Sequence, residues 1–111
     1  MASYDEGLLE RLRERLEPEP GLSERKMFGG VALMLDGNMC VGVIKGGGLM
    51  VRLPQEEGDA VLAEPHVREM DLTGRSMKGW VIVDEPGYAD DADLERWVRR
   101  AVAYVRTLPP K

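Results

Sequence analysis

The sequence predicts one α+β domain over residues 1–111, built in two layers with the element order α-β-β-β-α-β-β-α. Three observations support this prediction. Apolar residues recur at helical spacing near both ends of the chain, short apolar runs separated by glycine turns fill the middle, and single helices interrupt the runs of strands. This pattern is typical of a five-stranded, mainly antiparallel sheet, and 111 residues leave room for one core.

The first helix is expected to start near Ser3. Ser3 and Glu6 have the spacing of a capping box, in which each side chain accepts a backbone N–H of the first turn. Pro18 and Pro20 end the helix because proline cannot continue its hydrogen bonding. The buried stripe consists of four leucines: Leu8, Leu9, Leu12 and Leu16.

Three antiparallel strands are expected within residues 27–53. Two glycine-containing segments, 36–38 and 46–48, can adopt the positive φ that tight hairpin turns require. Successive residues of the segment 31–35 are all apolar, so neither face of that strand is polar. We therefore expect the centre of the sheet to be covered on both sides.

The second half of the chain contains a short helix, two strands and a long helix. The short helix is expected within residues 53–65, with Ala60, Val61 and Leu62 as buried candidates, and the strands within 66–72 and 79–84. The last helix begins at Asp90 or Asp91, whose carboxylates suit a helix start. Its buried stripe is Leu94, Trp97, Val98, Ala101, Val102, Val105 and Leu108.

Composition excludes several classes of protein. Hydrophobic residues at 43% and charged residues at 32% are typical of a soluble globular domain. No apolar run reaches the roughly 18 residues that cross a bilayer, and the first residues lack a signal-peptide pattern, so we expect a cytoplasmic protein with no membrane contact. A net charge of −5 disfavours direct, nonspecific binding to nucleic acid.

No catalytic residue, metal site or cofactor site emerges from the residue spacing. Cys40 lies in an apolar strand and His66 at a loop, with no third member of a catalytic set. Arg25 and Lys26 precede the glycines 29–30, as they would in a phosphate cradle, but those glycines lead into a strand and not into a helix. We interpret them as permitting a bulge or the close approach of a packed helix.

One cationic patch is a candidate surface for a partner. It combines four cations near two aromatic residues that would pack beneath them: Arg25, Lys26, Arg75 and Lys78, with Phe28 and Trp80. The alternative is a solvated loop whose Trp80 fills the core. Four arginines of the last helix leave a similar choice between a nucleic-acid surface and a solvated face: Arg96, Arg99, Arg100 and Arg106.

Four segments together resemble the N-terminal domain of the TfoX/Sxy family of bacterial competence regulators. They are "RKMFGGVALMLDGNMCVGVI", "LMVRL", "GRSMKGWVIVD" and "LERWVRRAVAYVRTLP". The resemblance implies the same fold and supplies no catalytic residues. It also implies a role in which full-length members, which have two domains, assist the cyclic-AMP receptor protein at promoters. Because the motifs match the first domain only, this chain resembles a stand-alone member.

We therefore expect a noncatalytic domain that acts through protein contacts in transcriptional regulation, with the transcription machinery as partner. A homodimer is expected because three helices leave apolar sheet surface to cover. Direct nucleic-acid binding is one alternative, and it predicts an affinity that falls steeply with salt. A small-molecule-binding or enzymatic domain is the other, and it requires a concave pocket with convergent polar groups.

Overall fold

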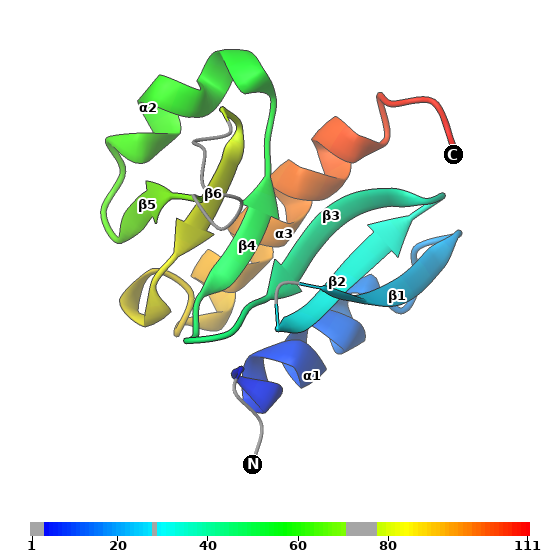
Figure 1. The fold of residues 1–111 in the computed structure, drawn as a ribbon, viewed down its shortest axis with the longest axis horizontal. Helices are drawn as coiled ribbons and strands as arrows, with labels where there is room; N and C mark the ends of the chain where they lie inside the picture. Colours follow the sequence, from blue (N-terminus) through cyan, green and yellow to red (C-terminus); the bar gives the residue numbers. More distant parts are fainter. Residues whose placement is uncertain (1–3, 28, 71–77) are drawn as a thin grey trace.

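The computed structural model describes residues 4–27, 29–70 and 78–111. Within these residues, six strands form one antiparallel sheet in the order β1-β2-β3-β4-β6-β5. Two helices, α1 (Glu6–Leu16) and α3 (Asp91–Val105), pack on one face of it, and Figure 1 looks onto the opposite face. The remaining elements are β1 Leu22–Met27, β2 Gly30–Leu35, β3 Asn38–Val43, β4 Leu49–Arg52, α2 Gly58–Leu62, β5 Val67–Glu69 and β6 Trp80–Val83, with 3-10 turns at Gln55–Glu57 and Glu85–Gly87.

The strand β1 corrects the expected count of five strands, and the order becomes α-β-β-β-β-α-β-β-α. Within the described chain β1 pairs only with β2, along their whole lengths. Its four central residues are exposed, and only Leu22 and Met27 are half-buried. An edge strand of this kind carries charged side chains on both faces, so it lacks the apolar signal by which a strand is recognised.

The predicted hairpins of the sheet centre are confirmed. Asp36 and Gly37 have φ of 50° and 83° and form the two-residue turn between β2 and β3. The three glycines between β3 and β4 also have positive φ. All residues of β2 are buried, as expected for a strand that is covered on both faces.

Gly30 at the start of β2 lies against the backbone of Val43 in β3. A Cβ at this position would overlap the carbonyl oxygen of Val43, so only glycine lets the two strands pair at this distance. The close approach is therefore made by a neighbouring strand and not by the packed helix that we expected. The bulge of this hairpin lies elsewhere, at Leu33 and Met34.

The apolar core lies between the sheet and the helices. The leucine stripe of α1 is fully buried there, as predicted, together with the stripe of α3 up to Val105, where the helix ends. Asp5 holds the N-cap of α1: its Oδ1 accepts the Leu8 N–H at 2.9 Å, and its Oδ2 accepts the Tyr88 hydroxyl at 3.2 Å. The expected cap, Ser3, lies outside the described residues.

The helix expected within residues 53–65 is shorter than predicted. A 3-10 turn precedes α2, which has five residues. Of the three buried candidates, Val61 is buried and Leu62 is half-buried, whereas Ala60 is exposed. A helix of barely more than one turn can direct only one side chain squarely into the core.

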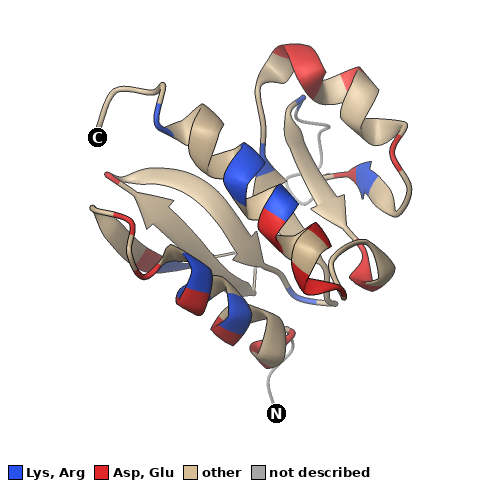
Figure 2. Ribbon diagram, turned by 180° about the vertical axis from the view of Figure 1, so that it is seen from behind, with Lys and Arg blue, Asp and Glu red and all other residues tan. Residues whose placement is uncertain are grey.

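Ion pairs join α1 and the segment after it to α3 and its C-cap, and Figure 2 marks the positions of the charged residues along these helices. Arg11 of α1 contacts Asp91 at the start of α3 at 2.9 Å. Beyond α1, Glu19 contacts Arg99 at 3.2 Å and Arg106 at 2.9 Å. The hydrogen bond from Arg106 has the largest effect on the pKa of Glu19 and lowers it; burial opposes this effect, and the hydrogen bond from Arg99 lowers the pKa further by a smaller amount.

Replacing Gly30 by alanine is expected to destabilise the fold by about 2–3 kcal/mol, because β2 and β3 must separate to admit the methyl group. The matched control is Gly7→Ala in α1, where a Cβ would meet only ordinary contacts. Alanine there should leave the stability unchanged or raise it by up to about 1 kcal/mol. Urea unfolding followed by circular dichroism measures both, and a Gly30→Ala variant as stable as the native chain would contradict this account.

Glu19→Gln is expected to lower the free energy of unfolding at pH 7 by about 0.5–1 kcal/mol. Because the folded state lowers the pKa of Glu19, its carboxylate stabilises the fold above the usual glutamate pKa of 4.5. That contribution is lost as the pH falls through the lower pKa of the folded state. The difference between the two proteins should therefore shrink in acid. Glu14→Gln, at an exposed position of α1, is the control for removing one surface carboxylate.

Candidate functional site

The sheet face opposite α1 and α3 is built around sulfur-containing side chains. We call it the methionine face, because Met27, Met34, Met39, Met50 and Met70 all belong to its apolar cluster. Its deepest members are almost fully buried, whereas Met27, Met39 and Trp80 are only half-buried. The sequence forms this face because the residues of β2, β3 and β4 that alternate with the core positions are also apolar.

Arg52 stands at the end of β4 on the same face, directly opposite Trp80 of β6. Its guanidinium carbon lies 4.9 Å from the centre of the Trp80 ring and 5.8 Å from that of Tyr104 in α3. The Nη1 atom donates to the Met39 carbonyl oxygen at 3.5 Å, the limit for a hydrogen bond, and the Nε atom is buried without a partner among the described residues. The two rings thus hold a guanidinium whose hydrogen-bonding capacity is largely unused.

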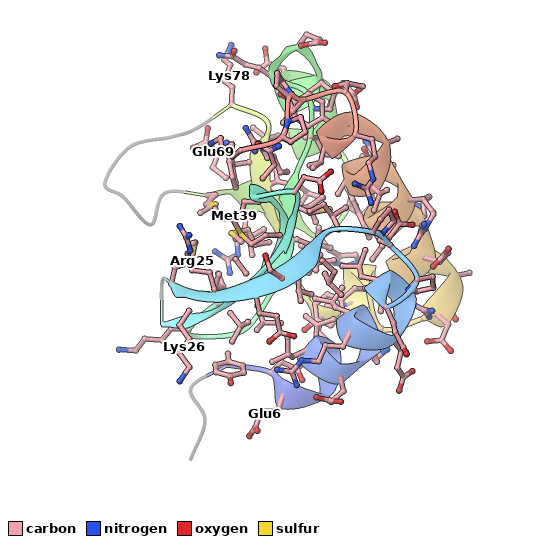
Figure 3. All side chains as sticks on the ribbon, turned by 90° about the vertical axis from the view of Figure 1, so that its right-hand side faces the viewer. Glu6, Arg25, Lys26, Met39, Glu69 and Lys78 are labelled. Atoms are coloured by element: carbon pink, nitrogen blue, oxygen red, sulfur yellow. The ribbon has the colours of Figure 1, made fainter. Side chains whose placement is uncertain are left out.

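A hollow of about 480 Å³ opens between these side chains. Figure 3 shows Arg25 and Met39 on the side of the sheet away from the helices. No carboxylate among the described residues forms an ion pair with Arg25 or Arg52. The hollow is lined by Arg25, Met27, Met34, Gly37, Met39, Arg52, Trp80 and Lys111.

The structure separates the described members of the predicted cationic patch. Arg25 pairs with Ala32 and Lys26 with Val31, so the two side chains leave opposite faces of β1, as Figure 3 shows. Lys78 lies beside α2, with its Nζ 3.9 Å from an Asp59 oxygen. Only Arg25 and Trp80 share the hollow. The other two members, Phe28 and Arg75, lie outside the described residues.

Sequence reasoning missed Arg52 and the methionines around it. The available signal was the "LMVRL" segment, in which an arginine interrupts an apolar strand at a position that alternation assigns to the face away from the core. Its contacts with Trp80 and Tyr104 depend on strand register and helix packing, which no local pattern reveals.

Comparison with protein families gives a match to the family model described as the TfoX N-terminal domain. It covers residues 14–105, which span the last turn of α1, every described strand and all of α3. The chain belongs to the TfoX N-terminal domain family. This confirms the resemblance inferred from the four sequence segments. The search of curated proteins finds no match.

In this TfoX N-terminal domain the three arginines of α3 and Arg106 at its C-cap form ion pairs. Arg96 and Arg100 contact Glu64 at 3.3 Å and 3.1 Å, and Arg99 and Arg106 contact Glu19. Each of these guanidiniums therefore has a carboxylate of the same chain as an ion-pair partner. The contacts favour a solvated, self-paired face over a nucleic-acid surface on this helix.

The thiol of Cys40 and the imidazole of His66 lie in different environments, one buried and the other exposed. Cys40 is 1% exposed, and burial raises the pKa of its thiol to about 12. His66 is exposed at a turn with a φ of 66°. Among the described residues, no group of His, Cys, Asp and Glu side chains is placed to hold a metal ion, and no helix is long and apolar enough to cross a membrane.

Cys40 should resist thiol reagents in the folded protein. At pH 8 the buried thiol is protonated and inaccessible, so Ellman's reagent should detect no thiol until denaturant is added, and then one per chain. The denatured sample is the control for reagent and protein integrity. Rapid stoichiometric labelling of the native protein would show that the strand around Cys40 opens readily.

Proposed function

We propose that this TfoX N-terminal domain is a noncatalytic interaction module of the cytoplasm that binds a protein partner on its methionine face. Its role would be transcriptional regulation of the competence type, with the transcription machinery as the partner. The observation that carries the proposal is the hollow itself, where methionine and tryptophan side chains lie beside Arg25 and Arg52.

The chemistry of this face suits protein recognition. Methionine side chains are flexible and polarizable, so they adapt to the shape of an inserted side chain. Tryptophan and arginine are enriched among the residues that dominate binding energies, and both line the hollow. Its volume of about 480 Å³ also lies within the range of pockets that accept whole side chains or small ligands.

Direct nucleic-acid binding is the second candidate, and Trp80 supports it, because an aromatic ring beside cations on an exposed sheet can stack a base. The net charge of −5 and the self-paired arginines of α3 count against it. Only a few cations would contact phosphates. We therefore favour a protein as the occupant.

Self-association remains part of the proposal, but through another surface. If two copies met symmetrically at the methionine face, Arg25 and Arg52 of one copy would face the same cations of the other. Such a contact is electrostatically unfavourable. The outer edge of β1, which pairs with no strand among the described residues, is the surface on which we place a homodimer.

The test uses the full chain labelled with ¹³C in its methionine methyl groups. A partner captured from the native cell is purified and titrated into the labelled protein. The methyl signals of Met27, Met34 and Met39 should shift on binding, and Arg25→Glu should weaken binding at least tenfold. Lys26→Glu is the matched control, because it reverses a neighbouring charge on the opposite face of β1.

Two outcomes would contradict the proposal. One is a purified partner that leaves the methionine methyl signals unchanged, and the other is an equal effect of the Arg25 and Lys26 substitutions. Binding of single-stranded DNA at low salt, with shifts of these methyl groups that vanish steeply as salt rises, would establish the second candidate in its place.

A further inference from the structure

We infer that the occupant of the methionine face is an acidic protein segment in which two carboxylates flank one apolar side chain. This inference rests on the proposed function and specifies the partner's chemistry. Three features lead to it: the sign of the charge on this face, the unused hydrogen bonds of Arg52, and the spacing between Arg25 and Arg52.

Charge is distributed unequally between the two layers. The chain carries a net charge of −5, yet no Asp or Glu among the described strand residues projects from the methionine face by the register of the sheet. Three arginines do project from it: Arg25, Arg52 and Arg68. Arg68 contacts Asp84 at 3.0 Å, which leaves Arg25 and Arg52 without ion pairs among the described residues. The face is therefore complementary to an anionic partner.

Arg52 is prepared to bind a carboxylate. Its guanidinium is fixed by Trp80 and Tyr104, so little side-chain entropy is lost on binding. Among the described residues it makes a single, long hydrogen bond, to the Met39 carbonyl. A guanidinium next to apolar side chains forms strong bidentate hydrogen bonds with a carboxylate, because little water competes there. A lysine ammonium could not form this bidentate pair.

The spacing of the two cations indicates the pattern of the segment. Arg25 lies on β1 and Arg52 on β4, three strand spacings or about 14 Å apart across the sheet. The register aligns Arg25 with Met50 of β4, so Arg52 lies two residues further along the strands and the diagonal between the two positions is about 16 Å. Met34 and Met39 pair with each other on the two strands between them and lie beside this diagonal. Four residues of extended chain span about 13 Å, and residues i, i+2 and i+4 point to the same side. Because the arginine and glutamate side chains can cover the remaining distance, an extended segment of the form acidic-x-apolar-x-acidic matches this arrangement of two cations around two thioethers.

The probe is a short capped peptide with the core Glu-Thr-Leu-Thr-Glu, titrated into the methionine-labelled full chain. We expect saturable shifts of the Met34 and Met39 methyl signals. Replacing both glutamates of the peptide by lysine should abolish these shifts, and replacing the leucine by serine should weaken binding about tenfold. A tenfold loss corresponds to about 1.4 kcal/mol.

Variants of the protein assign the contacts. Arg52→Gln and Arg25→Gln should each weaken peptide binding at least tenfold, whereas Lys26→Gln should leave it within twofold. Arg25 and Lys26 both lie on the exposed strand β1, so that pair keeps the test valid even if Arg52→Gln proves unstable by circular dichroism. Equal loss in the Arg25 and Lys26 variants would overturn the inference.

The outcome separates this inference from the proposed function. If the natural partner shifts the methionine methyl signals but the acidic peptide does not, the acidic segment is wrong while the docking face stands. If the signals shift only with protein concentration, a second copy is the occupant and the inference fails. If single-stranded DNA shifts them and the peptide does not, the inference fails together with the proposed protein partner.

Discussion

The fold depends on a sheet whose central strands are apolar on both faces, while helices cover only one. β2 has no exposed residue, and Gly30 at its start leaves room for the Val43 carbonyl of β3. The helical face supplies most of the core. On the other face, among the described residues, long flexible side chains such as those of methionine and arginine shield Ala32, Met50 and Ile82. The candidate site therefore lies on the sheet face that α1 and α3 leave uncovered.

Charged side chains form ion pairs on the helical layer, whereas two arginines of the methionine face have no such partner among the described residues. On the helical layer, Glu64 contacts two arginines of α3, and Glu19 contacts one arginine of α3 and the C-cap Arg106, so that these cations have ion-pair partners. On the methionine face, Arg25 and Arg52 lack such partners among the described residues. A chain that is acidic overall can therefore present a local anion-binding surface, because its carboxylates are concentrated elsewhere.

Much of the fold could be predicted from the sequence, because the helices and the central hairpins have strong local signals. The stripe of α3 and the glycine turns are examples, and membership of the TfoX N-terminal domain family agrees with them. The edge strand β1 was missed because its side chains are polar on both faces. Without this strand, Arg25 and Lys26 were expected to belong to one patch. In a strand, neighbouring side chains point to opposite faces, so the two residues are separated. Arg52 could not be found locally, because its ring contacts come from β6 and α3.

Glu64 determines how much positive charge the last helix exposes. Arg96 and Arg100 share this one carboxylate, and both guanidiniums also lie over the Trp97 ring, at 4.9 Å and 4.7 Å from its centre. Losing the glutamate by a single substitution would leave each guanidinium with one more distant carboxylate, Asp93 at 3.8 Å from Arg96 and Glu57 at 3.7 Å from Arg100, while the indole still positions both. A neutral residue at this position would therefore make the last helix more positive by removal of an acid and not by addition of a base.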